Sequence, residues 1–133
     1  MDKPKILLVD DEPDARDIIE RHLCRHIECS VYNAQDGRQA LELIGKENFD
    51  VAILDVKMPG ISGIDVLRKL KEVNPQVGVL VVSGWNSQQV AQAAINEGAV
   101  DYIIKPSNME VIFSKVRALL EKINKYFPKA EQK

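Results

Sequence analysis

Short apolar runs alternate with amphipathic stretches along most of the chain. The runs are rich in Val, Ile and Leu and lack regular polar alternation, which is typical of strands that are covered on both faces. We predict five strands at these runs: Lys5–Val9, Cys29–Asn33, Val51–Leu54, Val77–Val82 and Val100–Ile104. A stretch with helical periodicity follows each of them.

Five helices are predicted in the amphipathic stretches. The first begins near Pro13, a residue suited to the first turn of a helix. Within it, the residues that recur at helical spacing are Ala15, Ile18, Ile19, His22 and Leu23. The other four predicted helices are Arg38–Glu47, Ile64–Val73, Ser87–Glu97 and about Asn108 to Lys125. Gly98 stands where a glycine commonly ends a helix.

Strict alternation of strands and helices indicates a parallel sheet, because parallel strands need crossover connections. The predicted fold is therefore α/β and doubly wound, with a five-stranded parallel sheet in the flavodoxin-like order 2-1-3-4-5 and five helices. The length of 133 residues fits one domain. We assign this domain to residues 1–125 and interpret residues 126–133 as a C-terminal tail or the start of a linker.

Composition narrows the class of function. The formal net charge of −2 argues against direct nucleic-acid binding, which usually requires a basic surface. The early apolar run Ile6–Val9 is too short for a signal peptide or a membrane span, so we expect a cytoplasmic protein. The two cysteines, Cys24 and Cys29, suit a reducing compartment and are interpreted as small thiols that fill the core.

Polar residues come directly after four of the predicted strands. They are Asp10 and Asp11 after the first strand, Asp55 after the third, Ser83 after the fourth and Lys105 after the fifth. Open α/β sheets bind ligands outside the carboxyl ends of their strands. In the order 2-1-3-4-5 the first and third strands are neighbours, so Asp10, Asp11 and Asp55 are expected to meet at one edge of the sheet.

Repulsion between three such carboxylates requires compensation. Two carboxylates ~4 Å apart repel by about 4 kcal/mol at an effective dielectric constant near 20. Oxygen ligands without Cys or His favour Mg²⁺ or Mn²⁺, and Mg²⁺ is often completed by phosphate oxygens. The Ser83 hydroxyl and the Lys105 ammonium could donate to a phosphoryl group, and a carboxylate can act as a nucleophile toward phosphorus.

Four segments together resemble one family. They are ILLVDDEPD, DVAILDVKMPGISGIDVL, VVSG and GAVDYIIKP, in this order and spacing. The chain resembles the receiver domains of response regulators in two-component signal transduction over roughly residues 4–123. No single segment is specific alone, whereas the combination is.

The resemblance implies a phosphoacceptor and a metal site. Asp55 resembles the phosphoacceptor of the family. Asp11 resembles the direct ligand of Mg²⁺, with Asp10 acting through water. Asp55 and the backbone carbonyl of Lys57 complete the protein ligands of the metal.

The resemblance also implies contacts to the phosphoryl group and a switch. Ser83, the backbone of Gly84 and Lys105 correspond to the residues that contact the phosphoryl group. The Lys105–Pro106 bond is expected to be cis. Tyr102 stands at the position of the aromatic switch residue, which turns inward when the hydroxyl of Ser83 is drawn toward the phosphate.

Three positions depart from the commonest residues of the family. Gly84 replaces an alanine and leaves more room beside the phosphate. Trp85 is bulky at a position where the lifetime of the phosphoryl group is often tuned. Ser107 replaces a phenylalanine and changes how the last helix would be anchored.

The expected function is a phosphorylation-dependent signalling switch and not a turnover enzyme. A sensor histidine kinase or a phosphotransfer protein would supply the phosphoryl group. The altered conformation would control a downstream partner or a fused output domain. The surface formed by the fourth helix, fifth strand and fifth helix is expected to support partner contact or a homodimer.

Two other classes of function compete with the switch. A Mg²⁺-dependent phosphohydrolase with an aspartyl nucleophile usually has a second Asp two residues later, where this chain has Lys57. An interaction module that is never phosphorylated, or a flavin-binding domain, could share the architecture. Flavin binding is disfavoured because the acids after the first strand would repel a phosphate.

Overall fold

The computed structural model describes residues 2–56, 62–84 and 87–130. Within these residues, five parallel strands form one sheet in the order β2-β1-β3-β4-β5. The strands are β1 Lys5–Val9, β2 Ser30–Ala34, β3 Val51–Leu54, β4 Gly78–Ser83 and β5 Asp101–Ile104. The helices are α1 Pro13–His26, α2 Gly37–Ile44, α3 Gly63–Val73, α4 Gln88–Asn96 and α5 Met109–Lys122. The predicted fold class and strand order are confirmed.

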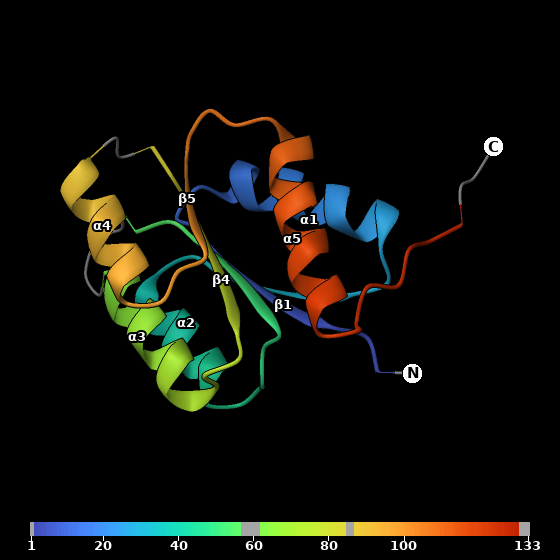
Figure 1. Ribbon diagram of the computed structural model, residues 1–133, viewed down its shortest axis with the longest axis horizontal. Helices are drawn as coiled ribbons and strands as arrows, with labels where there is room; N and C mark the ends of the chain where they lie inside the picture. The colour runs from blue at the N-terminus through green and yellow to red at the C-terminus, as the bar shows by residue number, and fades with distance from the viewer. Residues whose placement is uncertain (1, 57–61, 85–86, 131–133) are drawn as a thin grey trace.

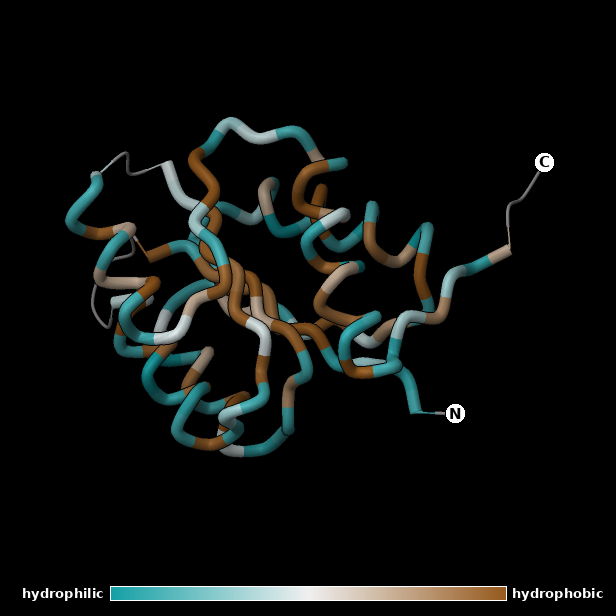
Figure 2. Tube along the Cα trace, viewed as in Figure 1, coloured by the Kyte–Doolittle hydropathy of each residue, from teal (hydrophilic) through white to brown (hydrophobic). Residues whose placement is uncertain are grey.

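Two hydrophobic layers cover the sheet. Helices α1 and α5 lie on one face, and α2, α3 and α4 lie on the other (Figure 1). Successive strand residues alternate between the layers, so that Leu7 and Val9 join the second layer while Ile6 and Leu8 join the first. The strands form the hydrophobic centre of the molecule in Figure 2, and polar residues concentrate on the outer helical faces. This double burial explains why the strands lack polar alternation.

Strands β1 and β3 have the predicted bounds, and where other elements depart from the predicted bounds they do so by one to three residues. Strand β4 continues to Ser83, which the sequence placed just after the strand. Helix α2 ends at Ile44, and the prediction of a helix to Glu47 was too long because the Lys46 amide bonds the Leu43 carbonyl, three residues back, in a tighter turn than an α-helix. Gly98 adopts a φ of +108° just beyond α4, which confirms its predicted role in ending that helix.

One of the residues that recur at helical spacing in the first helix is exposed. Ile18 has 56% of its surface exposed, whereas Ile19 and Leu23 are buried against the sheet. Ile19 and Leu23 are four residues apart and share one face of α1, and Ile18 is displaced by about 100° around the helix axis. The periodicity therefore identified the helix, but it did not show which side chains face the sheet.

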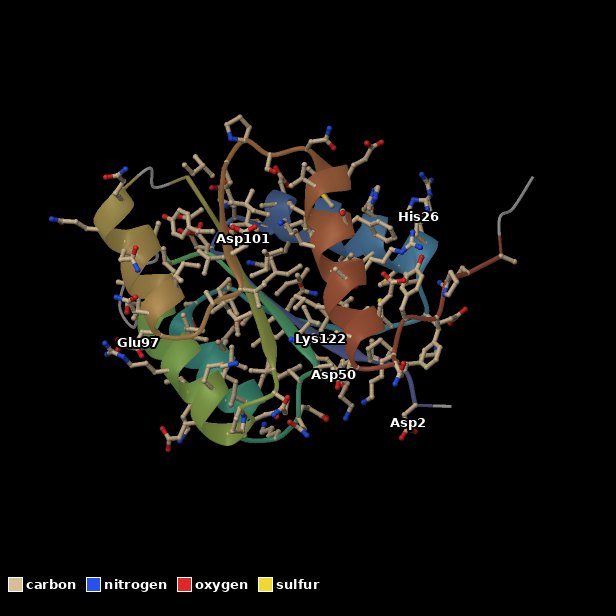
Figure 3. The ribbon with its side chains drawn as sticks, in the orientation of Figure 1. Asp2, His26, Asp50, Glu97, Asp101 and Lys122 are labelled. Carbon is tan, nitrogen blue, oxygen red and sulfur yellow. The ribbon has the colours of Figure 1, made fainter. Side chains whose placement is uncertain are left out.

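The first residues of the predicted C-terminal tail pair with the end of α1. The Glu28 amide donates to the Phe127 carbonyl at 2.8 Å, and the Lys129 amide donates to the His26 carbonyl at 2.8 Å. Ile27 and Pro128 form an isolated antiparallel bridge. Figure 3 shows His26 at the end of α1, close to the chain that runs to the C-terminus. The sequence did not reveal this pairing, because it joins Phe127 and Lys129 to residues about one hundred positions earlier in the chain.

An ion pair joins β5 to α5 and makes the fold sensitive to acid. Asp101 Oδ2 lies 2.9 Å from Lys115 Nζ, and Figure 3 labels Asp101 on β5. The hydrogen bond with Lys115 lowers the pKa of Asp101 below its ordinary value of 3.8, burial opposes this shift, and the Tyr102 amide reinforces it. Because the folded-state pKa is depressed, the stabilisation is present above the unfolded pKa and is lost as the pH falls through the folded pKa.

We expect Asp101→Asn to lower the free energy of unfolding at neutral pH by less than about 1 kcal/mol, because both side chains are partly exposed. The difference from the wild type should shrink as the pH is lowered from about 5 to about 3. Thermal melts across this range would measure it. A difference that stays constant down to the lowest pH would show that the charge of Asp101 contributes nothing.

Candidate functional site

Three carboxylates meet at the carboxyl ends of β1 and β3. The Asp55 amide donates to the Val9 carbonyl at 2.8 Å, which places the two strand ends side by side. Asp10 and Asp55 are each 5% exposed, whereas Asp11 is exposed. One ligand oxygen from each of Asp10, Asp11 and Asp55 lies within 4.8 Å of the others. The strand order thus brings together residues that are 45 positions apart in the chain, from 10 to 55.

Lys105 approaches this cluster from the end of β5. Its Nζ lies 2.5 Å from Asp10 Oδ2, 3.2 Å from Asp55 Oδ2 and 4.0 Å from Glu12 Oε1. Burial is the largest influence on Lys105 and lowers its pKa, but the Asp10 and Asp55 carboxylates together outweigh it, and the net pKa is raised. Lys105 therefore stays charged at neutral pH. It neutralises part of the acidic cluster and leaves a net negative site that can hold a cation.

The donor set fits a hard divalent cation. Mg²⁺ prefers oxygen ligands and is bound in proteins by one or two carboxylates, with other positions left to water or phosphate. Asp10, Asp11 and Asp55 supply carboxylate oxygens at the required proximity. The fourth predicted protein ligand, the carbonyl of Lys57, lies outside the described residues.

The loop after β1 is held by contacts that the sequence did not reveal. The Arg16 guanidinium donates from Nη1 to the Asp10 carbonyl at 2.5 Å, and the Glu12 amide donates to Asp10 Oδ1 at 2.9 Å. These contacts fix both the backbone and the carboxylate of Asp10. An arginine in the first turns of an amphipathic helix is indistinguishable in sequence from a solvated one, so no local signal could have identified Arg16.

Ser83 and Tyr102 form the other side of the site. Ser83 is fully buried at the end of β4, and its carbonyl accepts the Lys105 amide at 2.8 Å. The pKa of Tyr102 is raised above its ordinary value, mainly by burial and to a smaller extent by the charge of Asp55. A side-chain hydrogen bond with Ser83 acts in the opposite direction and lowers this pKa. The Tyr102 side chain therefore faces Ser83 and lies within the electrostatic influence of Asp55.

Gly63 brings the start of α3 against the end of β3. A Cβ at this position would lie 2.5 Å from Val56 Cα and 2.6 Å from the Asp55 carbonyl oxygen. Both neighbours are backbone atoms, which cannot rotate away. The Ser62 side chain caps the helix by accepting the Asp65 amide at 3.2 Å. The absence of a side chain at Gly63 thus permits the close approach that places α3 beside Asp55.

Other predicted site residues are placed as follows. The Lys105–Pro106 peptide bond is cis, as expected. Gly84 is exposed, and a Cβ there would meet nothing within 4 Å, in agreement with the extra room that the sequence indicated. Trp85 lies outside the described residues. Beyond Ser107, α5 begins with the Asn108 side chain accepting the Glu110 amide at 2.7 Å.

The family model of the response regulator receiver domain matches residues 6–117. The chain belongs to the response regulator receiver family. Response regulator MprA of Mycolicibacterium vanbaalenii is 37% identical over 118 residues, which are 89% of this chain and 51% of that protein. A cyclic di-GMP phosphodiesterase of Thermotoga maritima is 36% identical over 111 residues, 84% of this chain and 29% of that protein. The chain thus spans about half or less of the length of these relatives.

Solved structures agree with this assignment. A response regulator of Burkholderia pseudomallei, whose structure is described as containing a phosphorylated aspartic acid, a calcium ion and citrate, superimposes with a TM-score of 0.79 at 28% sequence identity. The match covers 92% of this chain and 71% of that one. Within the described residues, no helix is long and apolar enough to cross a membrane. Receiver domains are in general signalling domains rather than catalysts.

Proposed function

We propose that this receiver domain is switched by phosphorylation of Asp55. The observation that carries the proposal is the burial of the Asp55 carboxylate beside Asp10, Asp11 and the Lys105 ammonium. A nearly buried carboxylate in contact with a permanent cation, next to two further acids, is suited to accept a phosphoryl group with the help of a divalent ion. The phosphorylated aspartate described for the Burkholderia pseudomallei relative supports this chemistry.

Asp10, Asp11, Asp55 and the Lys57 carbonyl are proposed to hold Mg²⁺ or Mn²⁺. When bound, the ion would neutralise charge on the transferred phosphoryl oxygens. A carboxylate oxygen of Asp55 attacks phosphorus, and the bond between phosphorus and the imidazole nitrogen of a kinase phosphohistidine breaks. The imidazole leaves with the electron pair and takes up a proton, so the charges balance.

Lys105 and Ser83 are proposed to contact the transferred group. Lys105 already lies 3.2 Å from Asp55 Oδ2, so its ammonium can donate to a phosphoryl oxygen bound to that carboxylate with little movement. The Ser83 hydroxyl and the amide of Gly84 would donate from the adjacent strand end. Charge-assisted hydrogen bonds of this kind orient the group and stabilise the charge that develops in transfer.

The Ser83–Tyr102 contact is proposed to transmit the signal. If the Ser83 hydroxyl turns to the phosphoryl group, its hydrogen bond with Tyr102 must change, because both compete for the same hydroxyl. Tyr102 lies on β5 between α4 and α5, so its movement would alter the surface of these three elements. We propose that this surface contacts the output partner or fused domain, or a second copy of the chain.

A histidine kinase or phosphotransfer protein in the cytoplasm is the proposed donor, and response-regulator relatives imply such partners and output domains. We propose that this segment itself does not turn over a substrate. The phosphodiesterase relative is matched over only 29% of its length, so its name describes a longer protein. Hydrolysis of a small phosphate ester over many turnovers would instead support the phosphohydrolase alternative.

The direct test is incubation with acetyl phosphate and Mg²⁺, followed by measurement of the intact mass. One added phosphoryl group, absent when a chelator replaces Mg²⁺, is the expected result. Beryllofluoride should bind in the same way if the acyl phosphate is hydrolysed too quickly to accumulate. If no adduct formed and beryllofluoride caused no change in Tm, the proposal would be overturned. An interaction module without phosphorylation would then be favoured.

Binding of Mg²⁺ is also expected to stabilise the fold. The gain follows RT ln(1 + [L]/Kd), which is about 2.7 kcal/mol when the free ion is at one hundred times its Kd. Millimolar Mg²⁺ should therefore raise the Tm above that in a chelator at matched ionic strength. Asp11→Asn should abolish most of this increase while leaving the Tm in chelator nearly unchanged, because Asp11 is exposed. An equal Mg²⁺ response in the variant would contradict the assignment.

A further inference from the structure

Two free thiols face each other at the junction of α1 and β2. Cys24 lies in the last turn of α1, and Cys29 directly precedes β2; both are partly buried. Burial, followed by the charge of the neighbouring Cys24 thiol and a side-chain hydrogen bond with it, raises the pKa of Cys29 to about 12. This hydrogen bond makes the two side chains neighbours across the turn between helix and strand. The sequence alone suggested only two separate core-filling thiols.

The environments of the two thiols differ. Cys24 lines an open hollow on the outer surface of α1, together with Ile18, Arg21, His22, Arg25 and Met109. Cys29 instead packs against the hydrophobic layer beneath α1 and α5. A small solute can therefore reach Cys24 from the hollow, whereas Cys29 is not among the residues that line it.

Lys129 connects the C-terminal segment to this pair. Its Nζ donates to the Cys24 carbonyl at 2.5 Å, and its positive charge lowers the pKa of Cys29, in opposition to burial. A cation at this position stabilises negative charge that develops on the Cys29 sulfur as it loses its proton. The pair thus has an accessible thiol, a shielded thiol in contact with it and a cation beside the shielded one.

We propose that Cys24 and Cys29 form a reversible oxidation site, in which a peroxide converts the two thiols into an intramolecular disulfide. The Cys24 sulfur attacks a peroxide oxygen, the O–O bond breaks, and Cys24 becomes a sulfenic acid while water leaves. The Cys29 sulfur then attacks the Cys24 sulfur and expels hydroxide, which takes the Cys29 proton as water. Two thiols and hydrogen peroxide thereby give one disulfide and two waters.

This site lies away from the phosphorylation site. Cys29 is at the amino end of β2, whereas Asp10 and Asp55 are at the carboxyl ends of their strands, on the opposite edge of the sheet. The disulfide would fix the end of α1 to the start of β2, where Phe127 and Lys129 also pair. Its formation can therefore be measured without relying on phosphoryl transfer at Asp55.

The test is equilibration of the chain in glutathione redox buffers, trapping with N-ethylmaleimide and measurement of the intact mass. The reduced chain gains two adducts, and the disulfide form gains none and is lighter by two hydrogens. The ratio of the disulfide form to the reduced chain, at the known composition of the glutathione buffer, gives the effective concentration of the two thiols. We expect it to be higher in the native chain than in urea by a factor of roughly ten or more, because the fold holds the pair in contact. By linkage, the disulfide must raise the Tm.

Two single variants test the order of reaction. In Cys29→Ser the remaining thiol is the accessible Cys24, and in Cys24→Ser it is the shielded, protonated Cys29. N-ethylmaleimide should therefore alkylate the first variant faster than the second. With peroxide, neither variant can form the intramolecular bond. An effective concentration in the native chain no higher than in urea would overturn the proposal, as would peroxide treatment that gives only disulfides between chains or only added oxygen atoms.

Discussion

Asp55→Asn is expected to abolish the uptake of a phosphoryl group from acetyl phosphate, with no adduct in the intact mass. The amide of asparagine lacks the negative charge and the nucleophilic oxygen of a carboxylate, and it cannot form an acyl phosphate. Lys105, which lies 3.2 Å from Asp55 Oδ2, would retain Asp10 as its partner at 2.5 Å, so the fold should survive.

Stability measurements separate this effect from unfolding. Asp55→Asn removes one of three clustered carboxylates, so its Tm in a chelator should equal or exceed that of the wild type. Its increase on addition of Mg²⁺ should be much smaller. Asp17→Asn is the matched control, because Asp17 is an exposed surface partner of Arg21 and should leave the adduct intact. A phosphoryl adduct on Asp55→Asn would place the acceptor at another residue.

Gly63→Ala is expected to destabilise the fold by about 2–3 kcal/mol, the upper part of the usual range of about 1–3 kcal/mol for overpacking, because both close neighbours are backbone atoms. The added Cβ would lie 2.5 Å from Val56 Cα and 2.6 Å from the Asp55 carbonyl oxygen, so α3 or the end of β3 must shift. Helix propensity alone predicts the opposite sign, because alanine stabilises a helix relative to glycine by roughly 1 kcal/mol. The Tm should fall by on the order of 10 °C.

The same shift should slow phosphoryl uptake, because it acts on the peptide that carries Asp55. Gly45→Ala provides the control at the end of α2. A Cβ there would meet its nearest neighbours at 3.5 and 3.7 Å, which is ordinary contact, and the backbone is already helical. This variant should be stabilised by about 0.5 kcal/mol through reduced freedom of the unfolded chain. If both variants were more stable than the wild type, the close contact of position 63 with the backbone of Asp55 and Val56 would be contradicted.

Much of the fold follows from local patterns. Five short runs rich in Val, Ile and Leu, separated by helical periodicity, indicate a parallel sheet with two covered faces, and the structure confirms the sheet order. Errors occurred where the local pattern is ambiguous. Ile18 and Ile19 are adjacent and equally apolar, and only the packing of α1 against the sheet buries one and exposes the other. The pairing of Phe127 and Lys129 with the end of α1 likewise depends on contacts across about one hundred residues.

The sequence by itself determined the class of fold and the acids, hydroxyl and lysine near the strand ends, because the extent of each apolar run shows roughly where its strand ends. Only the tertiary structure decided how these residues meet. The approach of Lys105 to both Asp10 and Asp55, the Arg16 contact that holds the Asp10 carbonyl, and the backbone contact at Gly63 all join residues from separate elements. Distances between such residues depend on how whole helices and strands pack, and this packing has no signature in any short stretch of the chain.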